Sequence, residues 1–397
     1  MRSGGDARAD ATPTFPARGA AHPTVRPHAP MDIAFFGSSL VSAYWNGAAT
    51  YYRGLLRALA ARGHRVTFYE PDAYDRQSHR DIEDPPWARV VVWPSDAGSL
   101  EACLEEAGHA DLVVKASGVG VHDALLEARV LELRRPGNRV VFWDVDAPAT
   151  LERVDADRSD PFRALVPRYD LVFTYGGGPP VVAAYEALGA RRCVPVYNAL
   201  DPETHHPAMP EARLACDLAL LANRLPDREA RVREFFLDPA ARLPQRRFVL
   251  GGAGWGDLPL PPNVSWLGHV PTADHNALNS SALAVLNVNR DSMARFGFSP
   301  PTRVFEAAGA GACIVCDAWE GLETFLEPGR EVIVARSGDD VAAAVGALSR
   351  ERARAVGAAA RRRVLAEHTY SRRALEVEAA LGVAPERRGA GAVQGAP

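Results

Sequence analysis

Apolar runs of strand length alternate with longer stretches of helical periodicity from residue 31 onward. Asp32–Gly37 is apolar and ends in glycine, which is typical of a buried strand. Ala48–Arg62 has apolar residues at helical spacing, and Arg65–Glu70 is again strand-like. A strand, a helix and a strand in succession form a βαβ unit, whose strands run parallel. The pattern therefore predicts a parallel sheet covered by helices.

The same alternation continues as far as Tyr197 and restarts at Asp217. A polar, proline-rich segment, Asn198–Pro207, separates the two parts and is typical of a linker between domains. The chain is therefore expected to be an α/β protein with two Rossmann-like, doubly wound domains, whose strand-end loops face a shared cleft. Further strands are expected at 89–93, 111–116, 139–145, 170–175, 192–197, 217–222, 247–251, 264–268, 283–288, 312–316 and 331–335, and further helices at 122–135, 180–188, 227–237, 272–280, 301–310, 339–348, 350–367 and 371–381.

The two ends of the chain lack this pattern. The first thirty residues contain repeated prolines and no hydrophobic periodicity, and the last residues are rich in glycine and alanine, so both ends are expected to be disordered. The predicted organisation is a disordered extension at 1–30, a first domain at 31–198, a linker at 199–215, a second domain at 216–369, a last helix at 370–382 that packs back on the first domain, and a disordered tail at 383–397.

Charge and cysteine content narrow the class of protein. The 397 residues carry 45 basic and 49 acidic side chains, a net charge of −4, which gives no basic field for nucleic acid or anionic membrane. No apolar run is long enough for an integral membrane segment, and no secretory signal is present. Five scattered cysteines favour a reduced, cytoplasmic compartment over a disulfide framework. An enzyme acting on small molecules is expected.

A glycine-rich turn follows one strand of the second domain. Gly251–Gly256 superficially matches a dinucleotide-binding motif, but Asp257–Asn263 after it is too rich in proline to form the required helix. A turn beside a ligand, with Gly254 close to it, is the better interpretation. A purely structural turn explains the same residues equally well.

The stretch Phe298–Gly311 is the most informative. Ser299 is expected to be the N-cap of a helix that begins with prolines, and a helix N-terminus favours anions. Arg303 and Glu306 are three residues apart and share one helix face. They suit a phosphate and the hydroxyls of a ribose, respectively, or they form an ordinary surface ion pair.

Several motifs resemble those of glycosyltransferases with two Rossmann-like domains, the GT-B fold. Trp45–Val66 resembles their amino-terminal glycine and "GH-x-V" signature, and Val196–Pro207 resembles their linker entry. Leu286–Arg290, Arg303–Ala312 and Gly321–Glu331 resemble the CgeB-like branch of the family-four-type glycosyltransferases, a branch named for a spore maturation protein. The resemblance covers residues 31–381.

This resemblance implies a nucleotide-sugar donor in the second domain and an acceptor mainly in the first. Glu306 matches the glutamate that hydrogen-bonds the donor ribose, and Arg224 and Arg228 match the basic residues at the diphosphate. The predicted donor-binding set is Arg224, Gly254, Asn287, Asn289, Arg290, Arg303 and Glu306. Many retaining relatives have a second glutamate where this chain has Phe298. Relatives usually need no metal, so neither a metal nor a cofactor other than the co-substrate is expected.

Catalytic and acceptor-binding candidates come from the first domain. Asp144 and Asp146 lie two apart at a strand end, where either is a candidate general base for an inverting reaction, with capping of the next helix as the alternative role for one of them. Arg228 completes the predicted catalytic set, as a charge that stabilises the leaving diphosphate. The predicted acceptor-binding residues are Ser38, Asn46, Gly47, Lys115 and His122, although a lone histidine is more often a surface residue.

No metal site is expected from the sequence. Cys313 and Cys316 have the spacing of a zinc half-site, but no second half-site exists, and both are expected in the core. His205 and His206 lie in the linker without a neighbouring cysteine or carboxylate.

The predicted function is transfer of a sugar, without a metal, from a nucleoside diphosphate sugar to a small molecule, glycan or protein. Hexosyl transfer is the expected type, and nucleic acid is not expected as a partner. A sugar-nucleotide epimerase of the same fold is an alternative, although no paired carboxylates are evident for it. A two-lobed binding protein without catalysis is another, although such proteins are usually exported.

Overall fold

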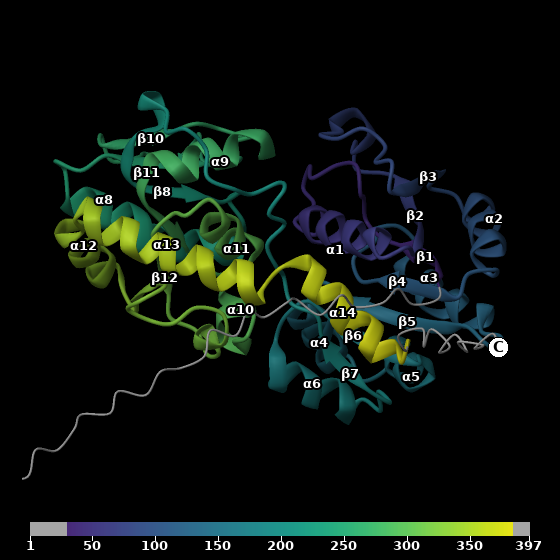
Figure 1. The fold of residues 1–397 in the computed structure, drawn as a ribbon. Helices are drawn as coiled ribbons and strands as arrows, with labels where there is room; N and C mark the ends of the chain where they lie inside the picture. Colours follow the sequence, from purple (N-terminus) through teal and green to yellow (C-terminus); the bar gives the residue numbers. More distant parts are fainter. Residues whose placement is uncertain (1–29, 384–397) are drawn as a thin grey trace, which may run out of the picture.

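The computed structural model describes residues 30–383 and contains two parallel sheets that lie side by side (Figure 1). The first sheet has seven strands in the order β3-β2-β1-β4-β5-β6-β7. Its strands are β1 (Asp32–Phe36), β2 (Arg65–Asp72), β3 (Ala88–Pro94), β4 (Leu112–Ala116), β5 (Arg139–Asp144), β6 (Leu171–Thr174) and β7 (Cys193–Pro195). Apart from their innermost residues, the predicted disordered extension and tail lie outside the described residues.

The second sheet has six strands in the order β10-β9-β8-β11-β12-β13. Its strands are β8 (Cys216–Leu221), β9 (Phe248–Gly251), β10 (Val264–Trp266), β11 (Ala282–Asn287), β12 (Ile314–Asp317) and β13 (Ile333–Ala335). Every strand pair in both sheets is parallel. The predicted fold class, two Rossmann-like domains of the GT-B type, is confirmed.

Helices lie on the faces of the two sheets (Figure 1). Those of the first domain are α1 (Ala49–Ala61), α2 (Ala97–Ala107), α3 (Asp123–Arg129), α4 (Ala147–Ala156), α5 (Phe162–Leu165) and α6 (Gly178–Ala187). Those that follow are α7 (Pro226–Val232), α8 (Asp238–Arg242), α9 (Thr272–Ser281), α10 (Asp291–Phe296), α11 (Thr302–Gly309), α12 (Gly338–Ala347), α13 (Arg350–Glu367) and α14 (Tyr370–Leu381). None of the helices in residues 30–383 combines the length and apolarity needed to span a bilayer.

Two helix boundaries differ from the predictions. The helix predicted at 227–237 continues through a π-helical turn at Arg233–Leu237 into α8. Ser299 is not an N-cap, because α11 begins after Pro301 and the Ser299 hydroxyl donates to the carbonyl of Gly297 at 2.8 Å. Consecutive prolines keep the backbone extended up to that point.

Both faces of the first sheet are buried, which explains its nearly continuous apolar strands. Along β1, Ile33 and Phe35 pack on one side of the sheet with α1, whereas Ala34 and Phe36 pack on the other side. Side chains alternate between the faces of a strand, so a strand covered on both sides must be apolar at every position.

The last helix joins the two domains. Helix α13 packs in the second domain against α11, whereas α14 returns to the first domain and packs against α1 (Figure 1). Tyr370, Ala374 and Val377 are buried in the same cluster as residues of α1. At the crossing, the amide of Leu200 donates to the carbonyl of His368 at 2.7 Å, and the carbonyl of Leu200 accepts from the amide of Tyr370 at 3.1 Å.

The α1–α14 contact depends on Gly54, because a Cβ added there would lie 2.2 Å from the Tyr370 ring. We expect Gly54→Ala to lower the free energy of unfolding by about 1–3 kcal/mol through overpacking. Gly346→Ala in α12 is the matched control, since its nearest neighbour would be 3.9 Å away. The control should be neutral or stabilise by up to about 1 kcal/mol. Equal effects of the two substitutions in chemical denaturation would contradict this packing account.

Candidate active site

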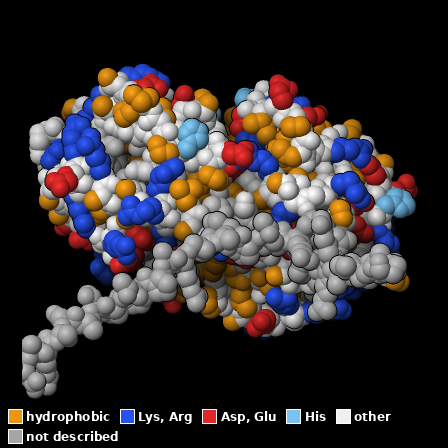
Figure 2. Space-filling model, in the orientation of Figure 1, with side chains coloured by type: hydrophobic (Ala, Val, Ile, Leu, Met, Phe, Trp, Pro, Cys, Tyr) orange, Lys and Arg blue, Asp and Glu red, His pale blue; other side chains and the backbone are white. Residues whose placement is uncertain are grey.

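A cleft of about 460 Å³ lies between the domains, at the carboxyl edges of both sheets. It is lined by loops that follow β1, β6, β8, β9 and β11, and by the start of α11. In each sheet the strand order reverses beside the first strand of the domain, β1 or β8, which is where open parallel sheets bind ligands. Figure 2 shows acidic and basic side chains interspersed on both lobes, so the outer surface on this face has no field of one sign.

The guanidinium group of Arg228 has no ion-pair partner among the described residues. It lies in α7, after β8, and one of its terminal nitrogens donates to the carbonyl of Asn223 at 3.2 Å. Its Nε atom is buried and has no hydrogen-bond partner. Burial and the positive charges of Arg303 and Arg290 lower the pKa of Arg228 to about 9. The guanidinium therefore remains charged at neutral pH and lacks an anion.

Arg303 and Arg290 line the same cleft but have fixed partners. Arg303 donates to the carbonyl of Leu221 at 2.5 Å and to Oδ1 of Asn287 at 2.9 Å. Arg303 and Glu306 form no ion pair, so the surface-pair interpretation is wrong for them. Arg290 donates to Asp227 at 2.6 Å and, across the domain boundary, to Asp146 at 3.2 Å.

Asn287 and Asn289 lie behind the arginines and do not line the cleft. Both are buried, and both contact Asp317: the Asn287 amide at 3.3 Å and the backbone N–H of Asn289 at 3.0 Å. The side chain of Asn287 also accepts from Arg303. Asn287 therefore supports Arg303, and Asn289 supports Asn287 by accepting from its side chain at 3.1 Å, in place of the predicted donor contacts.

In the glycine-rich turn, Gly252 lines the cleft and Gly254 does not. Gly252 has a φ of +126°, and a Cβ there would lie 2.1 Å from the carbonyl oxygen of Ala222, so only glycine fits. Gly254 instead packs beside Arg224. Arg224 pairs with Glu229 at 2.8 Å and with Asp257 at 2.7 Å, outside the cleft. The predicted contacts of Gly254 and Arg224 with the donor are therefore not supported.

Asp144 is fully buried and does not reach the cleft. Its carboxylate accepts hydrogen bonds from Ser117 at 2.7 Å, from the hydroxyl of Tyr185 and from the amide of Asp146 at 3.0 Å. Burial raises the pKa of Asp144, against the effect of these hydrogen bonds. The prediction that Asp144 is a general base is wrong, because both oxygens are used inside the domain. Asp146 begins α4 and faces Arg290.

The predicted acceptor residues divide into two groups. Asn46 and Gly47 line the cleft, and Ser38 supports Asn46 by donating to it at 2.9 Å. Lys115 is completely buried and pairs with Asp123, so it lies in the interior and not in the cleft. His122 begins α3 and lies 3.2 Å from the Ser95 carbonyl, also away from the cleft. The prediction for Lys115 is wrong because its side chain is completely buried, whereas the prediction for His122 stays a prediction.

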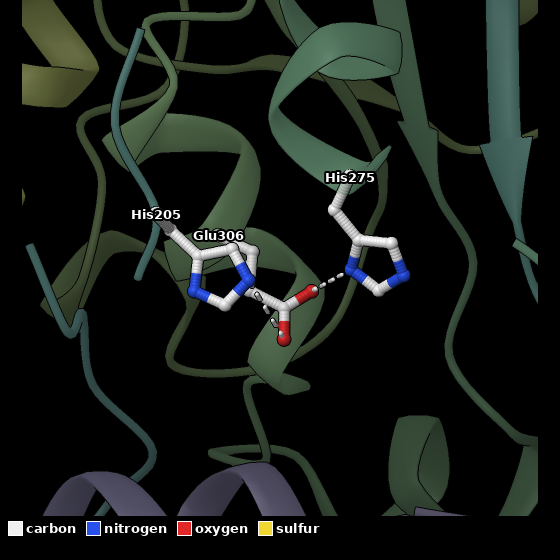
Figure 3. Close-up of side chains that lie close together, drawn as sticks. All are labelled: His205, His275 and Glu306. Atoms are coloured by element: carbon white, nitrogen blue, oxygen red, sulfur yellow. Dashed lines mark ion pairs between the residues drawn. The ribbon is translucent and has the colours of Figure 1, made fainter. Parts of the chain in front are cut away.

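Glu306 has two histidine neighbours (Figure 3). It is 8% exposed, with Nε2 of His205 at 4.0 Å from one carboxylate oxygen and Nδ1 of His275 at 3.8 Å from the other. The expectation that His205 lacks a neighbouring carboxylate is therefore wrong. His275, on α9, was not predicted, because a single histidine on a helix gives no local signal.

Sequence reasoning also missed two aromatic residues that line the cleft. Trp45 is 55% exposed and has a φ of 48°, and Tyr175 follows β6. Trp45 lies in the segment Trp45–Val66 that carries the family resemblance. A tryptophan in a loop of this segment is the one sequence signal that could have identified Trp45 as a site residue.

Two Rossmann-like domains with an arginine-lined cleft between them define the GT-B glycosyltransferase class of fold. Residues 228–379 match a family model described as "Glycosyl transferase-like". This match covers most of the second domain and continues into α14, and it includes Arg228 and Glu306. Together, the family model and the fold support the predicted transferase activity. A comparison with curated proteins finds no match.

Solved structures share the fold over most of the chain. Sucrose-phosphate synthase from Thermosynechococcus elongatus is 16% identical, with a TM-score of 0.66, covering 88% of this chain and 98% of that one. HepE of Anabaena, in complex with UDP and glucose, is 14% identical, with a TM-score of 0.65 and coverages of 89% and 99%. An α-glucosyltransferase, in complex with UDP-glucose and DNA, is 13% identical, with a TM-score of 0.66 and coverages of 89% and 99%.

The structural role of Asp144 predicts a loss of stability. Asp144→Ala leaves buried donors of Ser117 and Tyr185 without an acceptor, each at about 1–3 kcal/mol, so the free energy of unfolding should fall by about 2–4 kcal/mol. Asp155→Ala, at an exposed position of α4, is the control and should stay within about 0.5 kcal/mol. A stable Asp144→Ala variant that loses only turnover would restore the catalytic role.

Proposed function

We propose that this chain is a glycosyltransferase of the CgeB-like branch that transfers a hexosyl group from a nucleoside diphosphate sugar to an acceptor. The observation that carries the proposal is the charge in the cleft. Arg228, Arg290 and Arg303 converge there, and Arg228 has a buried nitrogen without a partner. Such a group favours a multivalent anion, and a diphosphate fits both the charge and the cleft volume.

Residues beside the arginines suit the rest of a nucleotide. Glu306 lines the same cleft, where its carboxylate can accept hydrogen bonds from ribose hydroxyls. Gly252 lets a ligand approach the backbone closely. The solved structures of HepE and of the α-glucosyltransferase contain UDP or UDP-glucose. These points together favour a uridine diphosphate sugar as the donor.

In the proposed reaction, an acceptor hydroxyl attacks the sugar and the glycosidic bond to the diphosphate breaks. Negative charge develops on the leaving diphosphate, and preorganised guanidinium groups stabilise it in place of a metal ion. The acceptor enters from the first domain, past Asn46, Gly47 and Trp45. Asp146 is the remaining candidate for the general base, next to Arg290.

Removal of one arginine should separate recognition of the diphosphate from recognition of the base. We expect Arg228→Ala to weaken binding of UDP by about 10- to 100-fold, because a charge-assisted hydrogen bond contributes about 1.5–3 kcal/mol. Binding of uridine, which lacks the diphosphate, should not change. Isothermal titration calorimetry with both ligands measures the difference.

Arg233→Ala is the matched control, because Arg233 directly follows α7 and is 54% exposed. It should leave the affinity for UDP within about twofold of the unmodified protein. Equal loss of affinity for UDP and uridine in Arg228→Ala, or equal effects of the two substitutions, would refute the assignment of the diphosphate to this cleft.

A further inference from the structure

Three potential metal ligands meet at one edge of the cleft. His205 comes from the linker, His275 from α9 and Glu306 from α11, and their side chains point toward one another (Figure 3). Their nearest ligand atoms all lie within 4.8 Å of one another. Within residues 30–383, no other group of three or more histidine, cysteine or acidic side chains has this spacing.

The two histidines present unsatisfied nitrogens to the carboxylate. His205 is only 2% exposed, and its Nε2 atom has no hydrogen-bond partner. Nδ1 of His275 is buried and has none either. The separations from Glu306, 4.0 and 3.8 Å, are too long for hydrogen bonds. A ligand bound between the two rings and the carboxylate would give both nitrogens a partner.

The hydrogen bond on the far side of His275 identifies the kind of partner. Its Nε2 atom lies 3.2 Å from the carbonyl oxygen of Val270, which can only accept a hydrogen. When Nε2 donates to this carbonyl, Nδ1 is left to act as a ligand on the side of Glu306. A metal ion between Nδ1 and the carboxylate would interact favourably with both. A backbone carbonyl behind a histidine ring is also the usual support of a metal-ligating histidine.

We propose that His205, His275 and Glu306 form a binding site for a divalent transition metal ion of the zinc class. Zinc ligands lie about 2.0–2.2 Å from the ion, so the ligand atoms of a tetrahedral site are about 3.3–3.6 Å apart, and the side chains would have to move slightly closer than the present 4.0 and 3.8 Å. Two imidazoles and one carboxylate are a known zinc ligand set that leaves one position open. Because His275 and Glu306 line the cleft, a water or a ligand oxygen can take that position.

An ion at this site would fix the position of Glu306. It would also tie the linker to α9 and α11, close to where the chain passes between the domains. The site shares Glu306 with the proposed ribose contact but uses none of the three arginines of the cleft. Metal binding is therefore a property of the chain alone and does not require the proposed donor.

Binding of the metal alone tests the inference. Full-length protein without a histidine tag is treated with a chelator and titrated with Zn²⁺ by calorimetry, and with Co²⁺ by visible absorption. We expect one ion per chain, a Co²⁺ spectrum of nitrogen and oxygen ligands, and a higher melting temperature with Zn²⁺, because a ligand that binds the native state stabilises it.

Conservative variants locate the site. His205→Gln and His275→Gln should each weaken Zn²⁺ binding by at least about 100-fold, since even residues behind metal ligands contribute about 10- to 100-fold. His206→Gln is the control, because His206 is the exposed neighbour of His205 and should bind Zn²⁺ like the unmodified protein. Arg228→Ala should also retain Zn²⁺ binding, so failure of the donor proposal and of the metal proposal are distinguishable.

Melting in the absence of metal shows whether each variant folds. His275 is only half-buried, so His275→Gln keeps the test valid if His205→Gln does not fold. No saturable binding, a cysteine-to-cobalt charge-transfer band, or unchanged Zn²⁺ affinity in a folded His275→Gln variant would overturn the proposal. The last result would mean that Zn²⁺ binds elsewhere on the chain and not at His275.

Discussion

Three positively charged arginines, Arg228, Arg290 and Arg303, lie together at the edge of the second sheet, and the structure of the cleft depends on balancing their charges. Burial, and then the nearby guanidinium groups of Arg303 and Arg290, lower the pKa of Arg228, and like charges in a partly buried place oppose folding. The fold offsets this repulsion by giving Arg290 two carboxylates and Arg303 two fixed acceptors. Arg228 is left without such compensation. A bound anion would supply it, which couples the electrostatics of the cleft to its ligand.

The cleft also depends on contacts that hold the domains face to face. The side-chain amide of Asn198 donates to the backbone carbonyl of Pro300 at 2.9 Å. The backbone N–H of Gly177 donates to the carbonyl of Phe298, also at 2.9 Å. Phe298 has a φ of 44°, and its ring packs so closely on Gly178 and Gly321 that neither can carry a Cβ. Phe298 is therefore a side chain that packs between the two domains.

Hydrophobic periodicity was sufficient to predict the sheets, because strands buried on both faces are apolar throughout. Arg228 could be predicted because it follows a first strand, where the topology places ligands. Asp144 was misassigned because spacing by two keeps side chains on one face only while the strand continues, and β5 ends at Asp144. The neighbours of Glu306 are His205 and His275, which come from other segments of the chain. A local sequence pattern does not predict that residues so far apart in sequence lie close together.

The central claim, that the cleft transfers sugar from a nucleotide donor, is tested most directly by measuring UDP release from UDP-sugars with and without candidate acceptors. The account predicts that UDP forms in proportion to glycosylated acceptor, and that Arg228→Ala lowers this rate by about 10²–10³. UDP-sugar that binds in the cleft but yields no UDP with any acceptor, or that is only converted into its epimer, would contradict it.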